Sequence, residues 1–389
     1  MEGNRQQNWT RRRFVGTVAL ASLGGTMSLE PAAFAASAPL ARKDGKPVET
    51  HAGLETVAGV LVTRDGTRLR TLTTRPAGAR GRLPAILFVH WLSCDTIELP
   101  ESADDGWSRM LKRVLRESGC VVMRTEKRGV GDSEGGPCSA LDYETELSDH
   151  RDALAHLAKS PWVDPERVVV YGASMGANYA PLVAAGARVA GVMTWGGGAR
   201  PWFERMLAFE RARRERSAMS GDRVDAEMKQ VAAFLHHYLI EGRTPEAIAR
   251  AHPELAGAWA LLLGTEGETH YGRPLAFHQQ AQRQDWGGAW SRLDAPALAM
   301  FGEYDWFEDP EGARWIAGLV NAKHPGRGRF VLVPQTDHHF VRFPDAAAAV
   351  SGKGGTTDAD PATNAMLAWL GEVTGVRAGR EAVAPGARP

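Results

Sequence analysis

The chain has 389 residues and carries 46 Lys plus Arg against 46 Asp plus Glu, so its formal net charge at pH 7 is zero. This balance lacks the basic excess that is typical of proteins bound to nucleic acid or to an anionic membrane, and we expect neither partner. Hydrophobic residues make up 43% of the chain, which is ordinary for a globular protein. The length allows one large α/β domain with an insertion, or two domains.

The first residues predict an export signal. Residues 10–16 read Thr-Arg-Arg-Arg-Phe-Val-Gly, which resembles a twin-arginine signal. The apolar stretch that follows is interrupted and falls short of the about 20 residues that a membrane span needs. Small-residue cleavage patterns end at Ala35 and Ala38, and we favour Ala35 because the alternative would leave Pro39 at the new N-terminus. We expect a signal peptide over 1–35 and a periplasmic or extracellular protein with no membrane span in the mature chain. A disordered basic tail is the alternative.

After a polar linker over 36–52, the hydrophobic pattern alternates between strands and helices. Val57–Val62 and Leu69–Thr73 flank the turn sequence Arg64-Asp65-Gly66 and predict a β-hairpin. Such alternation produces parallel sheets with right-handed crossovers, so residues 53–198 are interpreted as the first part of an α/β core, a mostly parallel central sheet flanked by helices. The further predicted strands cover 83–90, 120–124, 167–171 and 189–195, and the helices cover 107–118, 143–159 and 177–185.

The alternation stops between residues 199 and 293, where the pattern is helical and no convincing strand is found. Thr244 is a predicted helix cap, with proline in the first turn after it. We interpret 199–293 as a helical cap inserted into the sheet, with an independent domain as the alternative. Other helices in the insertion are predicted over 225–240 and 256–263. The second part of the core, 294–375, has predicted strands at 295–301 and 329–333, helices at 311–320 and 362–373, and a tail at 376–389 that is predicted to be disordered.

Gly-x-Ser-x-Gly occurs twice, and the two copies have different surroundings. Gly131–Gly135 lies in a glycine-rich segment that runs into a proline, which predicts a loop. Gly172–Gly176 follows the apolar, β-branched run 167–171 and precedes an Ala-rich helix. A sharp turn between a strand and a helix is what exposes a nucleophilic serine. The sequence therefore predicts Ser174 as the nucleophile and gives Ser133 no catalytic role.

A serine hydroxyl is a poor nucleophile at neutral pH, so it needs a base, and the base needs an orienting acid. Candidates stand at the ends of the two strands predicted after the insertion. Asp305 follows the first of these strands and His338 follows the second. We predict that Asp305 orients His338 and that His338 activates Ser174. The alternatives left open are Glu303 and Glu308 for the acid and His339 for the base.

These motifs resemble the α/β-hydrolase family over the whole predicted mature chain. The stretch 129–138 also resembles a branch of prolyl-oligopeptidase-like and esterase-like bacterial hydrolases, in which Ser133 belongs to a structural loop. The resemblance implies an α/β-hydrolase fold and the chain order nucleophile, acid, base. It rests on Gly172-x-Ser174-x-Gly176, Arg128-Gly129-x-Gly131-x-Ser133-x-Gly135, Gly302-x-x-Asp305 and Asp337-His338-x-Phe340.

In this family two backbone N–H groups stabilise the negative charge that develops on the substrate oxygen. The first should be Met175, directly after the nucleophile. The second should come from the loop after strand 83–90, where the usual His-Gly is replaced by His90-Trp91. We favour the Leu92 N–H, with Trp91 as the alternative. The candidate substrate-pocket residues are Trp91, His90, Trp195 and Trp202. Further cap aromatics that would line a pocket or form the cap core are Phe203, Phe209, Phe234, Tyr238 and Trp259.

Three cysteines are present. Cys94 and Cys138 fall in loops after neighbouring predicted strands, on the same edge of a parallel sheet, so we predict a Cys94–Cys138 disulfide, which suits an exported protein. Cys120 opens a strand and is predicted to be a buried free thiol. No cysteine–histidine spacing resembles a zinc site, and adjacent helical residues such as His236 and His237 diverge by about 100°. We expect neither a metal nor a cofactor.

The sequence predicts an exported serine hydrolase that cleaves a carboxylic ester or an amide through an acyl-enzyme. Its substrate is expected to be a small-molecule or short-peptide acyl compound, with ester favoured over amide. Aminopeptidase or acyl-peptide hydrolase, acyltransferase and thioesterase activities remain open on the same triad. A non-catalytic binding protein on this fold is the rival from another class. Epoxide hydrolase and dehalogenase chemistry are disfavoured because they would need a carboxylate at position 174. The oligomeric state is left open.

Overall fold

The computed structural model describes residues 40–217 and 219–376. The predicted signal peptide and the predicted disordered tail beyond residue 376 therefore lie outside the described residues. Among the described helices, none combines the length and the apolar character needed to cross a membrane.

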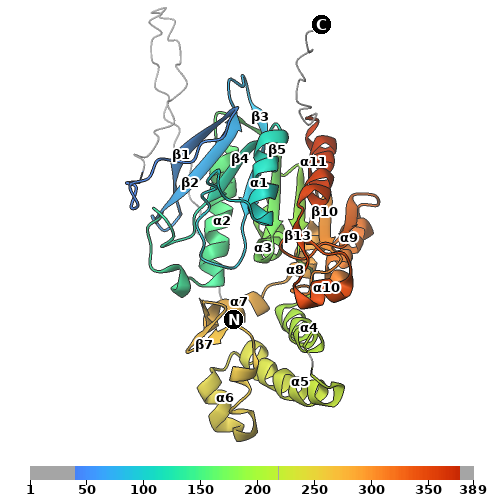
Figure 1. Cartoon of the computed structure of the whole chain (residues 1–389). Helices are drawn as coiled ribbons and strands as arrows, with labels where there is room; N and C mark the ends of the chain where they lie inside the picture. Colours follow the sequence, from blue (N-terminus) through green and yellow to red (C-terminus); the bar gives the residue numbers. More distant parts are fainter. Residues whose placement is uncertain (1–39, 218, 377–389) are drawn as a thin grey trace, which may run out of the picture. The chain divides into compact units, whose positions relative to one another are not determined.

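An eight-stranded sheet forms the centre of the core (Figure 1). Its order is β1-β2-β4-β3-β5-β6-β10-β11. The pairs β1–β2 and β2–β4 are antiparallel, and the remaining neighbours are parallel. The predicted hairpin and mostly parallel sheet are thus present. The strands are β1 (Leu54–Val62), β2 (Arg68–Pro76), β3 (Leu83–Val89), β4 (Val121–Thr125), β5 (Val163–Ala173), β6 (Gly191–Trp195), β10 (Ala297–Gly302) and β11 (Gly328–Val333).

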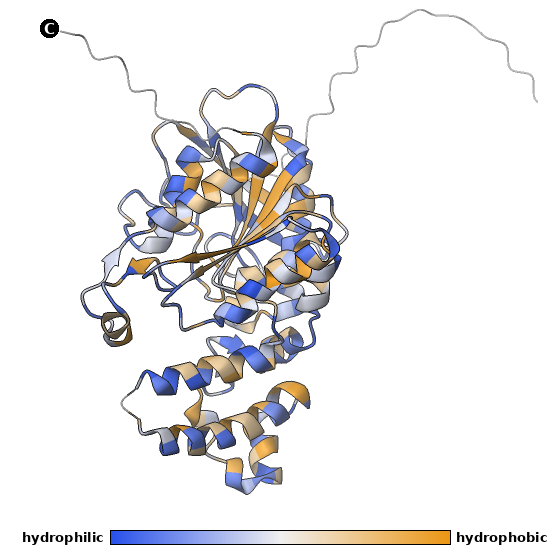
Figure 2. Cartoon of the chain, turned by 90° about the vertical axis from the view of Figure 1, so that its right-hand side faces the viewer, coloured by the Kyte–Doolittle hydropathy of each residue, from blue (hydrophilic) through white to orange (hydrophobic). Residues whose placement is uncertain are grey.

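Helices cover both faces of this sheet. Successive strand residues point to opposite faces, so Ile86 and Phe88 of β3 pack with α1 and α11, whereas Ala85 and Leu87 pack in the cluster that contains α2, α3 and α9. Figure 2 shows the hydrophobic colour concentrated along the strands, as expected for a sheet buried on both faces. The helices are α1 (Gly106–Glu117), α2 (Tyr143–Ala158), α3 (Met175–Ala184), α9 (Pro310–Lys323), α10 (Ala346–Ser351) and α11 (Asp360–Thr374).

Local signals set the helix starts. Asp105 precedes α1, and its carboxylate accepts a hydrogen bond from the Ser108 N–H at 3.0 Å. Asp142 does the same for α2 by accepting from the Thr145 N–H at 2.8 Å. Such caps satisfy N–H groups that have no partner within the helix. They fix where the crossover helices begin, and therefore where the loops at the carboxyl edge of the sheet lie.

The insertion after β6 is mostly helical, as predicted. The same apolar cluster contains Leu87 of the sheet and Phe277 and Trp286 of the insertion, so the cap core is continuous with one core layer. The helices are α4 (Trp202–Glu215), α5 (Gly221–Leu235), followed by a π-helical turn (His236–Ile240), α6 (Pro245–Ala251), α7 (Leu275–Gln282) and α8 (Trp286–Arg292).

Two expectations for the insertion are wrong. It contains a small antiparallel sheet of three strands, each two residues long, which is too short to produce a readable alternation. The segment 256–263 forms a turn and a short 3₁₀ segment (Trp259–Leu261) rather than an α-helix. The small strands are β7 (Thr265–Glu266), β8 (Thr269–His270) and β9 (Arg273–Pro274); two further short strands, β12 (Val341–Arg342) and β13 (Thr356–Thr357), pair outside the main sheet.

Candidate active site

Ser174 occupies the turn between the end of β5 and the start of α3. Its φ is +54° and its ψ −121°, a strained conformation for a residue with a side chain. The sharp turn needs close backbone approach on both sides. A Cβ on Gly176 would lie 1.9 Å from the Val89 carbonyl oxygen, and one on Gly172 would lie 2.3 Å from the Gly176 oxygen. The two motif glycines therefore allow the turn that lifts Ser174 out of the sheet.

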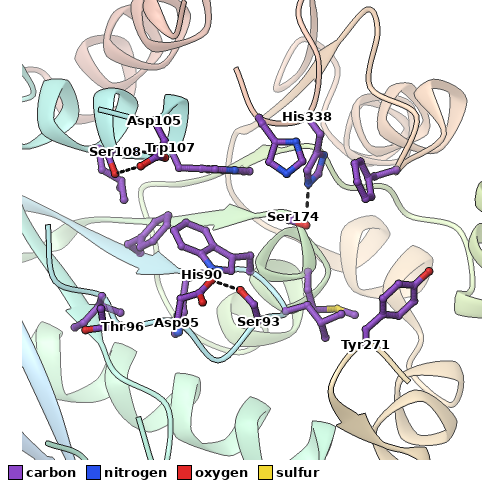
Figure 3. A pocket seen from close by; sticks show the side chains of 18 of the residues that line it. His90, Ser93, Asp95, Thr96, Asp105, Trp107, Ser108, Ser174, Tyr271 and His338 are labelled. Carbon is purple, nitrogen blue, oxygen red and sulfur yellow. Dashed lines mark hydrogen bonds between the residues drawn. The ribbon is translucent and has the colours of Figure 1, made fainter. Parts of the chain in front are cut away.

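The structure brings Ser174, His338 and Asp305 together. His338 Nε2 lies 3.0 Å from Ser174 Oγ (Figure 3). Its Nδ1 lies 2.6 Å from Asp305 Oδ2. Asp305 follows β10, and its other oxygen accepts a hydrogen bond from the Phe307 N–H at 2.9 Å. His338 follows β11. Three residues that follow parallel strands of one sheet thus form a continuous chain from carboxylate to hydroxyl, although β6 lies between β5 and β10. In this arrangement a histidine acts as general base.

The other candidate acids and base have different surroundings. Glu303 is exposed and accepts a hydrogen bond from the Gln335 N–H at 2.7 Å. Glu308 is buried and forms an ion pair with Arg205 of α4. The His339 side chain is exposed and lines the cavity described below, without a hydrogen bond to the serine or to Asp305 among the described contacts.

The charges around His338 favour the protonated form of its imidazole ring. Burial alone would lower the pKa of His338, but Asp305 and, further away, Glu308 raise it above 6.5. Burial raises the pKa of Glu308 to about 7, against the effect of Arg205. The imidazolium formed when His338 accepts a proton is therefore stabilised by neighbouring carboxylates.

Trp195 does not line the cavity, which corrects the prediction from its position at the end of β6. Its side chain is fully buried on the face of the sheet that carries α1 and α11. Its ring stacks on Phe340, with centroids 4.3 Å apart, and its Nε1–H donates a hydrogen bond to the His338 carbonyl oxygen at 3.0 Å. Trp195 therefore contacts the backbone of His338, the predicted base, and stabilises its position.

A cavity of about 650 Å³ opens beside Ser174 and His338. His90, Trp91 and Trp202, which were predicted as substrate-pocket residues, are among the residues that line it. Figure 3 shows His90 together with Ser174 and His338 on the cavity wall. Both the core and the cap contribute to its wall, because α4 and the segment before β9 supply side chains. The aromatic and apolar lining includes Phe88, Trp91, Leu92, Trp107, Met175, Trp202, Met206, Phe209, Tyr271 and Phe307.

Several lining residues were missed by the sequence analysis. Trp107 is the second residue of α1, and its ring lies 5.7 Å from that of His338. Phe307 follows Asp305 by two residues, and its ring lies 5.1 Å from His338. Phe307 could have been found from its closeness to the acid. No sequence signal singled out Trp107 or Tyr271, because their positions depend on how the helix and the cap fold over the sheet.

The predicted oxyanion donors stand in suitable places. Met175 is the first residue of α3, where backbone N–H groups have no partner within the helix, and Leu92 lies in the loop after β3. Both line the cavity together with Ser174. Their role as donors remains a prediction.

The first Gly-x-Ser-x-Gly copy forms a loop with a buried serine. Ser133 Oγ accepts a hydrogen bond from the Arg70 N–H at 2.9 Å and donates one to the Glu126 carbonyl oxygen at 3.3 Å. Asp132, the residue directly before Ser133, forms a 2.7 Å ion pair with Arg70. These contacts join the loop to β2, so Ser133 has a structural role.

The structure contains the predicted disulfide between Cys94 and Cys138. Cys120 is a buried free thiol, and burial raises its pKa to about 11. His236 and His237 both contact Glu241, at 3.5 and 3.0 Å. In the part of the chain that the structure describes, no group of three or more potential metal ligands is found.

The fold is similar to that of solved structures, an esterase among them. DcsB, solved as a complex with its substrate analogue, matches with a TM-score of 0.51 and 18% identity, over 83% of this chain and all of DcsB. Carboxyl esterase 2 from the fungus Tuber melanosporum matches with a TM-score of 0.50 and 12% identity, over 84% of this chain and 90% of the esterase. Together with the sheet and the strand-end site, this defines a serine hydrolase with the α/β-hydrolase fold.

A family model narrows the class. The model of the X-Pro dipeptidyl-peptidase (S15) family matches residues 65–338, a range that includes the whole sheet from β2 to β11 and the cap. The chain belongs to this family.

Curated relatives match shorter segments. The thiohydrolase aneE of Aspergillus aculeatus is 30% identical over 111 residues, which cover 26% of this chain and 32% of aneE. The quorum-quenching protein AidA of Acinetobacter baumannii is 38% identical over 66 residues, 17% of this chain and 21% of AidA. The chain thus matches about a third or less of the length of these relatives.

Proposed function

We propose that this protein is an exported serine hydrolase that cleaves carboxylic esters with an apolar acyl or alcohol group, through a Ser174–His338–Asp305 triad. The observation that carries the proposal is the hydrogen-bonded chain from Asp305 through His338 to Ser174 at the floor of an aromatic cavity. Geometry of this kind activates a serine hydroxyl on many unrelated folds.

The reaction follows from the contacts. His338 Nε2 takes the proton of Ser174 as the oxygen attacks the ester carbonyl, and Asp305 stabilises the imidazolium. The N–H groups of Met175 and Leu92 hold the oxyanion. His338 then protonates the leaving alcohol, which departs and leaves an acyl-enzyme. Water, deprotonated by His338, attacks the acyl-enzyme, and the carboxylic acid leaves as Ser174 regains its proton.

The lining of the cavity favours an ester over a charged peptide. Its walls are mainly aromatic and apolar. Two of the charged groups that line it are already ion-paired: Glu98 with Arg42 and Arg70, and Arg205 with Glu308. Recruiting Glu98 or Arg205 to bind a charged substrate would require breaking one of these pairs, which is costly in a partly buried site.

A dipeptidyl-peptidase activity is the second candidate, and membership of the S15 family supports it. Such an enzyme must bind the substrate's α-ammonium group. Asp95 is an exposed carboxylate on the cavity wall that accepts hydrogen bonds from Ser93 Oγ and, at 3.2 Å, from Trp91 Nε1. Asp95 is the carboxylate that we assign to that ammonium.

A substrate panel distinguishes the candidates. Purified protein is tested with p-nitrophenyl esters of increasing chain length, acyl-thioesters and X-Pro-p-nitroanilides, with Ser174→Ala as control. The ester proposal predicts the largest kcat/KM for an ester and no effect of Asp95→Asn beyond about twofold. A larger kcat/KM for X-Pro-p-nitroanilides that falls on Asp95→Asn would replace it by the peptidase. Turnover by Ser174→Ala at the wild-type rate would reject both.

We also propose export through a twin-arginine-type signal. The support is the Arg11-Arg12 sequence together with the Cys94–Cys138 disulfide, which persists in an oxidising compartment. Residues 1–35 fused to a reporter that functions only outside the cytoplasm should give signal. Replacement of Arg11, Arg12 and Arg13 by lysine should abolish it, and retention of export after that change would contradict the proposal.

A further inference from the structure

The loop after β3 is held from beneath by two buried cations. Lys127, at the carboxyl end of β4, donates hydrogen bonds from Nζ to the carbonyl oxygens of Trp91, of Leu92 at 3.1 Å and of Ser93 at 2.9 Å. Arg273, in β9 of the cap, donates from Nε to the Leu92 oxygen at 3.0 Å. Three consecutive carbonyl groups therefore turn toward these two cations.

The orientation of the carbonyl groups fixes that of the N–H groups. In a planar trans peptide the N–H of one residue points opposite to the C=O of the residue before it. Since the Trp91 carbonyl points at Lys127, the Leu92 N–H points away from Lys127. Trp91, Leu92 and Ser93 line the cavity, whereas neither cation is among the described lining residues. The N–H groups of Leu92 and Ser93 therefore point away from the cations, and Leu92 itself lines the cavity, which favours the Leu92 N–H as the second oxyanion donor.

A buried carboxylate holds the two cations. Glu146 of α2 lies 3.2 Å from Lys127 Nζ and 2.7 Å from the Arg273 guanidinium. All three side chains are almost fully buried. Burial alone would raise the pKa of Glu146, but Lys127 and Arg273 hold it well below its usual value. Burial lowers the pKa of Lys127 to about 7, against the effect of Glu146. The carboxylate is thus ionised and helps keep the lysine charged.

Arg273 also contacts both of the segments that the disulfide joins. Its Nη1 donates a hydrogen bond to the Cys138 carbonyl oxygen at 3.0 Å, while its Nε holds Leu92, two residues before Cys94. One cap side chain thus bridges the oxyanion loop, the segment that carries its disulfide partner, and α2.

We infer that Lys127 and Arg273, held by Glu146, are positioning residues that orient the Leu92 N–H for the oxyanion, and that docking of the cap is thereby required for turnover. The inference rests on the proposed acyl-enzyme mechanism and adds to it. Neither residue touches the substrate. A positive charge behind aligned peptide dipoles also stabilises the oxyanion more than the neutral ground state, so the effect belongs to kcat.

The test compares matched variants of the full-length protein on the best ester from the panel. Lys127→Met removes the three carbonyl contacts. Its control is Lys112→Met, another buried lysine whose Nζ donates to carbonyl oxygens, those of Glu101 and Ala103. We expect kcat to fall on the order of 10- to 100-fold in Lys127→Met with KM little changed, and to be retained in Lys112→Met. Circular dichroism at the assay temperature verifies folding of both.

A second pair tests the contribution of the cap without removing a charge. Arg273→Lys keeps the cation but loses the fork that reaches Leu92 and Cys138. Arg214→Lys makes the same change at a buried cap arginine that donates to the Leu261 oxygen at 2.9 Å. We expect about a tenfold loss of kcat in Arg273→Lys alone.

A trifluoromethyl ketone analogue of the same ester gives a readout that a merely structural role would not change. Its adduct with Ser174 carries an oxyanion, so its affinity should fall in parallel with kcat/KM in Lys127→Met and Arg273→Lys. Losses no greater than in the two controls, or losses confined to KM, would overturn the inference while leaving the triad intact. Failure of the triad is a separate result: wild-type turnover that does not depend on Ser174.

Discussion

Two segments of this protein carry the same Gly-x-Ser-x-Gly pattern and do different things. In Gly172–Gly176 the serine stands at a positive φ between a parallel strand and a helix, 3.0 Å from a histidine nitrogen. In Gly131–Gly135 the serine is buried, and its hydroxyl joins a loop to the Arg70 backbone. The glycines permit a tight turn in both segments. The strand that precedes the turn and the side chains that face the serine hydroxyl determine whether the serine can react.

The largest effect is expected from removing the hydroxyl of the first segment. Ser174→Ala should lower kcat by a factor on the order of 10⁶, because the cavity hydroxyls of Ser93 and Ser108 are hydrogen-bonded to carboxylates and not to His338. Steady-state kinetics on the best ester measures the loss. Residual activity within tenfold of the wild type would show that the reactive serine lies elsewhere.

The next largest loss of kcat is expected from changing Asp305, the proposed acid of the triad. Asp305→Asn should reduce kcat roughly 10⁴-fold, because an amide stabilises neither the required tautomer nor the imidazolium. Glu303→Gln, on the same loop but hydrogen-bonded to Gln335, is the control and should retain the wild-type kcat. Equal losses in the two variants would remove Asp305 from the triad.

The pH dependence of kcat/KM distinguishes the two serines, because Ser174 is hydrogen-bonded to His338, a base that titrates, and Ser133 is hydrogen-bonded to backbone groups. His338 must be neutral to act, and its raised pKa places the acidic limb of kcat/KM above pH 6.5. Glu308→Gln removes a carboxylate that raises this pKa and leaves Arg205 unpaired, so the limb should move to lower pH, by up to about one unit. Glu311→Gln on the surface of α9 is the matched control. A shift to higher pH in Glu308→Gln would contradict the assignment.

The smallest effect on catalysis is expected from the second serine. Ser133→Ala should leave kcat and KM unchanged but cost about 1–3 kcal/mol of stability, because the buried Arg70 N–H loses its acceptor. Thermal unfolding measures this cost. A loss of kcat without a loss of stability would mean that the loop contributes to the reaction.

The sheet and the triad positions were predictable because each rests on local signals. Ser174, Asp305 and His338 each belong to a short motif that follows a predicted strand. Parallel strands bring their carboxyl ends to one edge of the sheet. The same reasoning predicted the Cys94–Cys138 pair. Trp195 was misplaced because a strand residue points to one face or the other, and the face at a strand end depends on register.

Contacts across the insertion were not predictable. Arg273 reaches Leu92, 181 residues earlier in the chain, from a strand of two residues. No periodicity marks so short a strand, and nothing near Lys127 or Glu146 in sequence indicates that they meet a cap arginine. Arg205 and Glu308 are likewise joined only by the way α4 packs over the acid loop.

Labelling with a fluorophosphonate, followed by peptide mapping, shows which serine is activated, since the reagent modifies only such a serine. We expect one labelled peptide, modified at Ser174, in the wild type and in Ser133→Ala, and no labelling in Ser174→Ala. Labelling at Ser133, or labelling that persists in Ser174→Ala, would contradict this expectation.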